Sequence, residues 1–160
     1  MFGEILQGII MNTQIKIHIA ADWEQDLSVV NQIEKWNQTQ GGKYLISRDL
    51  DLLDDMEGEW FCFIKTNLKQ AIQESDIFLL IVGEDTISVK EGSCSLCENY
   101  RAFSGNCAHG RITDKKGFLE FQCAVAKELN KKIVVLYTMD FVDKSKCLQV
   151  IREIGQHMTM

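Results

Sequence analysis

Hydrophobic residues alternate or run continuously in several short stretches of the chain. Ile15, Ile17 and Ile19 alternate with polar neighbours, which predicts a strand over residues 14–21. Residues 77–82 (Ile-Phe-Leu-Leu-Ile-Val) are apolar without a break, as in a strand covered on both faces. The same pattern predicts a strand over residues 132–137 and a shorter one over residues 44–47.

Between these strands the apolar residues recur with helical spacing. Such runs predict helices from about residue 23 to 39, from 59 to 74, over 117–130 and over 144–154, with residues 156–160 as a closing edge strand. Alternating strands and helices indicate an α/β fold of the flavodoxin-like kind, a mostly parallel sheet with helices on both faces. Ligands of such sheets bind at the carboxyl ends of the strands, so the turn at residues 83–86 is expected near the site.

Length and charge narrow the classes of protein. The 160 residues, 46% of them hydrophobic, suit one domain spanning residues 1–160, with residues 1–11 as an extension. A net charge of −6 argues against a nucleic-acid surface. No apolar run is long enough to cross a membrane, and the first ten residues lack an export signal. We therefore expect a cytoplasmic protein with reduced cysteines.

Two segments raise the question of metal binding. Six carboxylates and no basic residue lie between Asp49 and Glu59, but their spacing does not match a calcium loop, so a solvated loop is predicted. Residues 87–116 form a long insert that brings four soft ligands within 16 residues: Cys94, Cys97, Cys107 and His109. These four either hold a structural zinc ion or are free side chains in a loop that packs over the site.

One polar residue interrupts the apolar stripe of the helix predicted at 117–130. On a helical wheel Gln122 is centred between Phe118 and Val125, whereas Glu120 falls with the solvated residues. A buried amide without partners costs about 1–3 kcal/mol. Gln122 is therefore either a core glutamine with satisfied hydrogen bonds or a residue that faces a cleft.

An ordered set of segments resembles the TIR domains, particularly the TIR-like proteins of bacterial Thoeris antiphage systems. The resemblance spans nearly the whole chain, and no single motif decides it. It is carried by Lys-Ile-His-Ile at 16–19, by residues 68–86 with Ala-Ile-x-x-Ser-Asp and Leu-Leu-Ile-Val-Gly-Glu-Asp-Thr, and by residues 118–137. Ser-Lys-Cys at 145–147 and Gly-Gln-His-Met at 155–158 are also similar.

The resemblance implies an enzyme that cleaves the nicotinamide–ribose bond of NAD and releases an ADP-ribose-derived signal. NAD would be a substrate, with no tightly bound cofactor; a second small molecule could serve as acceptor, and the product would act on a separate effector protein. The family's catalytic glutamate corresponds to Gln122, and an amide cannot replace a carboxylate. Three accounts stay open: an inactivating substitution, takeover by Glu120, or a non-catalytic relative.

The resemblance also places the ligand-binding loops. They correspond to Ala21, Asp22 and Trp23 after the first strand and to Ser47 and Arg48 after the second. Asp85 and Thr86, in the turn after the central strand, either contact ligand or form a plain turn. His18, between two isoleucines, is interpreted as a sheet histidine rather than a catalytic one.

Two alternatives to NAD cleavage fit the same fold. One is a scaffold or nucleotide-binding module that works by self-association of TIR-like domains. The other is an enzyme similar to nucleoside deoxyribosyltransferases, which also places a carboxylate at a sugar carbon. Turnover of NAD, of nucleosides or of neither separates the three.

Overall fold

A five-stranded parallel sheet forms the centre of the protein. In the computed structural model, which describes residues 14–160, it contains β1 (Ile15–Ala20), β2 (Tyr44–Arg48), β3 (Ile77–Val82), β6 (Lys132–Tyr137) and β7 (Gln156–Thr159). The strand order is β2-β1-β3-β6-β7, and every neighbouring pair is parallel. This is the flavodoxin-like order, so the predicted fold is confirmed. The predicted edge strand near the end of the chain is confirmed as β7.

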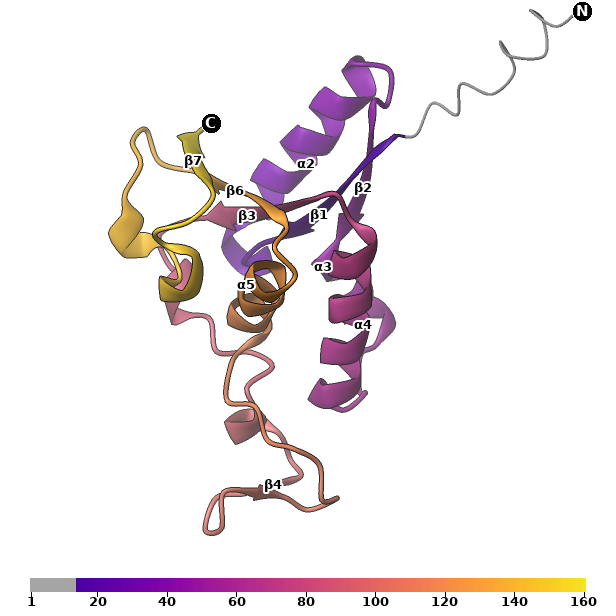
Figure 1. Ribbon diagram of the computed structural model, residues 1–160, viewed down its shortest axis with the longest axis vertical. Helices are drawn as coiled ribbons and strands as arrows, with labels where there is room; N and C mark the ends of the chain where they lie inside the picture. Colours follow the sequence, from indigo (N-terminus) through magenta and orange to yellow (C-terminus); the bar gives the residue numbers. More distant parts are fainter. Residues whose placement is uncertain (1–13) are drawn as a thin grey trace, which may run out of the picture.

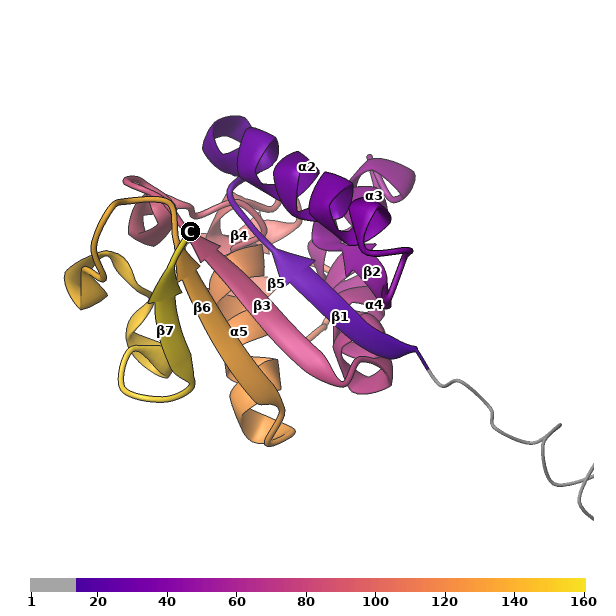
Figure 2. The same cartoon turned by 90° about the horizontal axis from the view of Figure 1, so that it is seen from above.

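Helices cover both faces of the sheet (Figures 1 and 2). The helix α2 (Trp23–Thr39) lies on one face, and α4 (Phe61–Glu74) and α5 (Phe118–Glu128) lie on the other. The short helix α3 (Asp49–Asp55) begins directly where β2 ends. None of the helices in residues 14–160 is long and apolar enough to cross a membrane.

The central strand β3 joins two hydrophobic cores, as its unbroken apolar sequence predicts. Leu79 and Ile81 pack with Val30 under α2. On the opposite face, Phe78 and Leu80 pack with residues of α5. All residues of β3 except Ile77 are buried. Burial on both faces makes β3 the rigid element from which the loops at its carboxyl end project.

Two predictions of local structure are wrong. The acidic run does not form a wholly solvated loop: its first seven residues make α3, and Asp49 is only 1% exposed. The helix predicted at 144–154 is replaced by two 3₁₀ turns, Lys144–Lys146 and Gln149–Ile151. Cys147 and Leu148 between them are extended and buried, so core packing overrides the helical spacing.

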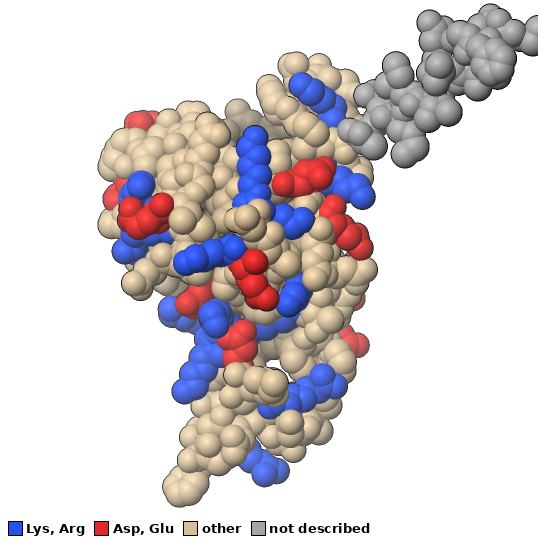
Figure 3. Space-filling model, in the orientation of Figure 1, with Lys and Arg blue, Asp and Glu red and all other residues tan. Residues whose placement is uncertain are grey.

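The insert between β3 and α5 lies at one end of the molecule, where its hairpin projects from the body (Figure 1). It contains the 3₁₀ turns Thr86–Ser88 and Cys94–Leu96 and the strands β4 (Tyr100–Arg101) and β5 (Asn106–Cys107). On the face shown in Figure 3 basic and acidic side chains are interspersed over the body, while the projecting end is mostly uncharged. The predicted extension at residues 1–11 lies outside the described residues.

Candidate functional site

A pocket of about 340 Å³ opens at the carboxyl ends of β1 and β3. In the flavodoxin-like order the connections from these two strands run to opposite faces of the sheet, which leaves a crevice between them. The pocket walls come from the loop after β1, the start of α3, the loop after β3 and the start of α5. Its lining residues include Ala21, Asp22, Trp23, Asp49, Leu53, Asp85, Lys90, Glu91 and Phe118.

The floor of the pocket contains a buried carboxyl group. Asp49 lies there because β2 ends at Arg48 and α3 begins with the next residue. Nε2 of Gln122 donates a hydrogen bond to Oδ2 of Asp49 at 2.8 Å. Burial raises the pKa of Asp49 to about 7, against the opposing effect of that hydrogen bond. At neutral pH the group is thus divided between its acid and its carboxylate.

Gln122 connects this carboxyl group to β1. Oε1 of Gln122 lies 2.8 Å from Nε2 of His18, and Nδ1 of His18 lies 2.9 Å from Oγ of Ser47. Gln122 and His18 are completely buried, whereas Ser47 is exposed. Burial lowers the pKa of His18, which keeps the imidazole neutral at pH 7. Gln122 is therefore a core glutamine with partners on both sides, which settles the choice that the sequence left open.

Two polar atoms of the pocket residues remain unused. Oδ1 of Asp49 and the indole N–H of Trp23 are buried and meet no hydrogen-bond geometry among the described residues, although the Trp23 N–H and the backbone N–H groups of Ala21 and Leu50 lie close enough to Asp49 to lower its pKa. Both residues line the pocket. Leaving such groups unsatisfied costs about 1–3 kcal/mol each, a penalty that a polar ligand removes. A group that both accepts and donates, such as a sugar hydroxyl, can bond to both.

A second carboxyl group, Asp26, lies beside the turn after β3. It is 4% exposed, and burial, followed by the charges of Asp22 and Asp85, raises its pKa to about 6. A β-carbon at Gly83 would collide with the Asp26 carboxylate. The glycine therefore allows α2 to approach the end of β3 closely.

The charges of the pocket walls disfavour anions. Five carboxyl residues and one lysine line it: Asp22, Glu24, Asp49, Asp85, Glu91 and Lys90. The amino end of α2 points here, but the Asp22 side chain already accepts a hydrogen bond from the backbone N–H of Glu24. A phosphate group would therefore meet negative charge and a helix end that is already capped.

The predicted binding residues fall into two groups. Ala21, Asp22, Trp23 and Asp85 line the pocket. Arg48 does not, because it forms ion pairs with Glu34 at 3.3 Å and Asp51 at 2.6 Å. Ser47 contacts His18, and its surface lies in a separate hollow beside Lys16 and Glu74.

The two predicted catalytic positions also lie outside the pocket lining. Gln122 reaches it only through Asp49, and Glu120 is partly exposed. Sequence reasoning missed Asp49, which it assigned to a solvated acidic run. Its position in the sequence could have identified it. Asp49 directly follows a strand, at the edge where open α/β sheets bind ligands.

A second pocket of about 420 Å³ adjoins the first beneath the insert. The two pockets share Leu53, Glu91 and Phe118 in their walls. Trp60, Phe61 and Leu96 give the second pocket a largely apolar lining, and Glu57, Glu59 and Glu98 are its further carboxyl residues. The two pockets are therefore neighbours that share part of a wall, and the second lies under the insert.

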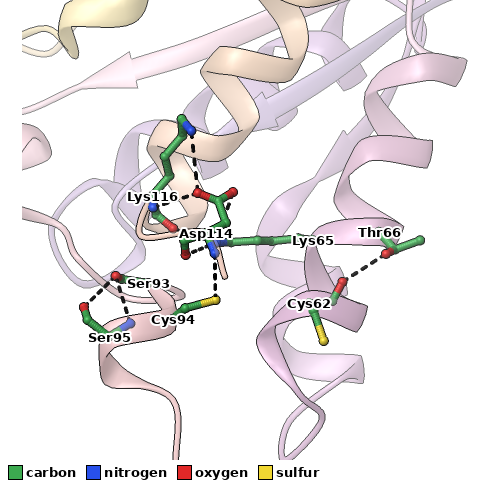
Figure 4. Close-up of polar contacts among 8 residues, drawn as sticks. All are labelled: Cys62, Lys65, Thr66, Ser93, Cys94, Ser95, Asp114 and Lys116. Atoms are coloured by element: carbon green, nitrogen blue, oxygen red, sulfur yellow. Dashed lines mark hydrogen bonds and ion pairs between the residues drawn. The ribbon is translucent and has the colours of Figure 1, made fainter. Parts of the chain in front are cut away.

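A buried lysine fixes the returning end of the insert against α4 (Figure 4). Nζ of Lys65 donates to the backbone carbonyls of Asp114 at 3.2 Å and Lys116 at 2.7 Å, and lies 3.6 Å from the Asp114 carboxylate. The backbone N–H of Asp114 in turn donates to Sγ of Cys94 at 3.2 Å. Lys65 is 5% exposed, so these contacts are shielded from solvent. They position the segment that leads into α5.

The structure gives the predicted zinc set no support. Within residues 14–160, no group of three or more His, Cys, Asp or Glu side chains is placed to hold a metal ion. His109 instead stacks on Trp60, with ring centroids 4.2 Å apart, and bonds to Asn99. The six cysteines are free thiols.

Comparisons with known proteins bear on the fold. No family model and no curated protein matches the chain. A solved 2-deoxyribosyltransferase from the psychrotolerant bacterium Bacillus psychrosaccharolyticus is similar, with a TM-score of 0.51 and 14% sequence identity. The match covers 91% of this chain and 85% of that one. The likeness shows the fold alone.

Proposed function

We propose that the protein breaks the N-glycosidic bond of a nucleoside and transfers or releases the sugar, with Asp49 as the catalytic carboxylate. Such reactions pass through a transition state with positive charge on the sugar, which a carboxylate stabilises. This proposal is supported by the setting of Asp49, which lines the pocket and has one oxygen held by Gln122 and the other outside hydrogen-bond geometry with any described residue. That half-used, buried carboxyl group is the observation that carries the proposal.

The pocket favours a neutral nucleoside over a phosphate-bearing ligand. Its volume of about 340 Å³ is near the lower end of the range for ligand pockets, which suits a nucleoside rather than a dinucleotide. The excess of wall carboxylates would repel a pyrophosphate. The fold-level likeness to a deoxyribosyltransferase supports the same substrate class by analogy.

The test is release of free base from 2′-deoxynucleosides, followed by chromatography with and without an acceptor base. We expect turnover by the unaltered chain and a loss of at least about 10²-fold in Asp49→Asn, which keeps the size of the side chain but removes its charge. Glu120→Gln is the matched control and should retain full activity. Equal rates in Asp49→Asn and the unaltered chain would refute the role of Asp49.

Cleavage of NAD is the second candidate, because the pocket beside the proposed nucleoside site would take the other half of a dinucleotide. It is also the reaction that the resemblance to TIR domains implies. NAD should be run beside the deoxynucleosides in the same assay. Loss of NAD with no reaction of deoxynucleosides would replace the first proposal with this one. Turnover of neither compound would favour a scaffold that acts through self-association.

A further inference from the structure

We propose that Gln122 and His18 form a hydrogen-bond chain whose direction reverses when Asp49 takes up a proton, with Ser47 as its solvent-exposed end. The chain runs from the pocket floor through two completely buried side chains to the far side of β1. Both are positioning residues, because they act on a substrate only through Asp49. Their role in catalysis rests on the proposed function. The reversal of the hydrogen bonds does not depend on it.

The chemistry of each member fixes the direction of the chain when Asp49 is ionised. A carboxylate only accepts, so Gln122 must present its amide N–H to Asp49 and its carbonyl oxygen to His18. Nε2 of His18 must then carry the ring proton and donate it to Gln122. Because a neutral imidazole has one donor and one acceptor, Nδ1 accepts from the hydroxyl of Ser47.

A proton on Oδ2 of Asp49, the oxygen that contacts Gln122, inverts every one of these roles, whereas a proton on Oδ1 would leave them unchanged. The acid now donates to the carbonyl oxygen of Gln122, after a half-turn of the amide. The amide N–H of Gln122 donates to Nε2 of His18, whose proton is now on Nδ1 and is donated to Ser47. One O–H bond forms on Asp49, one N–H bond forms at Nδ1 and one breaks at Nε2. The net gain is a single proton from solvent, and His18 is neutral in both arrangements.

Asp49 shares its pocket with charged residues, namely Asp22, Glu24, Asp85, Glu91 and Lys90, whereas the neighbours of the buried part of the chain are uncharged. His18 packs against the Phe78 ring of β3, with ring centroids 6.1 Å apart. The ionisable side chain that faces Asp49 from α5 is the Cys123 thiol, whose pKa burial raises well above its usual value, so it stays neutral. From α2 the facing side chain is the uncharged Trp23. Protonation of Asp49 is therefore the change in charge to which the hydrogen bonds of Gln122 and His18 respond.

The test is the ring protonation of His18, read from ¹⁵N chemical shifts of its two nitrogens in the full-length protein between pH 5 and pH 9. We expect the nitrogens to exchange their shifts, from a proton on Nε2 at high pH to one on Nδ1 at low pH. In Asp49→Asn the ring should keep one arrangement throughout. His157, bonded to Tyr137 and the carbonyl of Ile154, is the internal control.

A second variant separates the chain from general pH effects. Gln122→Met keeps the volume of the side chain and removes both the donor and the acceptor of the amide. In the folded variant, the ring proton of His18 should therefore stay on the same nitrogen at every pH. A single unchanged proton position in the unaltered chain from pH 5 to pH 9 would overturn the reversal. Because this measurement needs no substrate, absence of nucleoside turnover alongside the exchange would count against the proposed function only.

Discussion

Nε2 of Gln122 lies 2.8 Å from Oδ2 of Asp49, although 73 residues separate them in the chain. The contact joins the start of α3 to the first half of α5 across the end of the sheet. It gives the pocket floor a carboxyl group with one fixed oxygen. The resemblance to TIR domains implied a catalytic role at position 122; in the structure Gln122 lies outside the pocket lining and hydrogen-bonds a carboxyl group that lines it.

Activity should increase with pH around neutrality. The proposed role needs the ionised form of Asp49, whose pKa is raised to about 7 by burial. We therefore expect kcat/KM for a deoxynucleoside to rise with pH and to level off above about pH 8. Gln122→Met removes a hydrogen bond from both forms of Asp49, and the bond to the charged form is the stronger of the two, so the midpoint should move slightly to higher pH. A pH–rate profile of both proteins tests this, and a lower midpoint in the variant would contradict it.

Stability should change in the opposite direction with pH. The folded state holds the Asp49 proton more tightly than the unfolded state, because the pKa rises from an ordinary 3.8 to about 7 on folding. The contribution of Asp49 to the free energy of unfolding is therefore fully present below about pH 4. It is lost as pH rises through 7, and the free energy of unfolding falls by up to about 1.4 kcal/mol per pH unit over that range. Asp49→Asn should flatten the decline in urea-unfolding free energy, with Asp26 accounting for part of what remains up to about pH 6.

Placing a carboxylate at position 122 should destabilise the protein. Gln122→Glu sets a second buried acid against Asp49, and the two cannot both ionise at contact distance. We expect a loss of about 3–5 kcal/mol at pH 8 and a much smaller one at pH 5, measured by urea unfolding. Gln122→Met should lack this pH dependence.

The same Gln122→Glu variant separates the two readings of position 122. The TIR resemblance predicts that it creates or restores loss of NAD. Our assignment of the catalytic role to Asp49 predicts no gain in NAD consumption, because the new carboxylate would remain outside the pocket lining. Product mass analysis of NAD incubated with the variant distinguishes these outcomes.

Lys65 should control the order of the insert. Lys65→Met removes two hydrogen bonds to backbone carbonyls and leaves the Asp114 carboxylate without this ion pair. We expect a loss of about 1–3 kcal/mol and faster amide hydrogen exchange in residues 114–118. Lys69→Met, whose half-exposed ammonium lies 4.0 Å from Glu128, is the matched control and should change stability by less than about 0.5 kcal/mol. Equal effects of the two variants would contradict the proposed role of Lys65.

The hydrophobic pattern by itself determined the architecture. The unbroken apolar run of residues 77–82 could be buried only at the centre of a parallel sheet, and β3 lies there. Alternation of strands and amphipathic helices fixed the remaining layers, because each apolar stripe must be covered. The sheet-edge rule also placed the turn at residues 83–86, with Asp85, near the site, whereas Ala21, Asp22 and Trp23 were placed there by the resemblance to TIR domains.

Only the tertiary structure decided which polar residues meet. Asp49 is one of six carboxylates in an acidic run, and only its place directly after a strand distinguishes it from Asp51 and Asp54, which are exposed. Its burial depends on Gln122 from α5 and on the loop after β1, segments that are distant in the chain. Likewise, His18 and Gln122 each looked like an isolated polar residue on an apolar element. Hydrogen bonds require atoms within about 3 Å, and sequence spacing fixes such distances only within a single helix or strand.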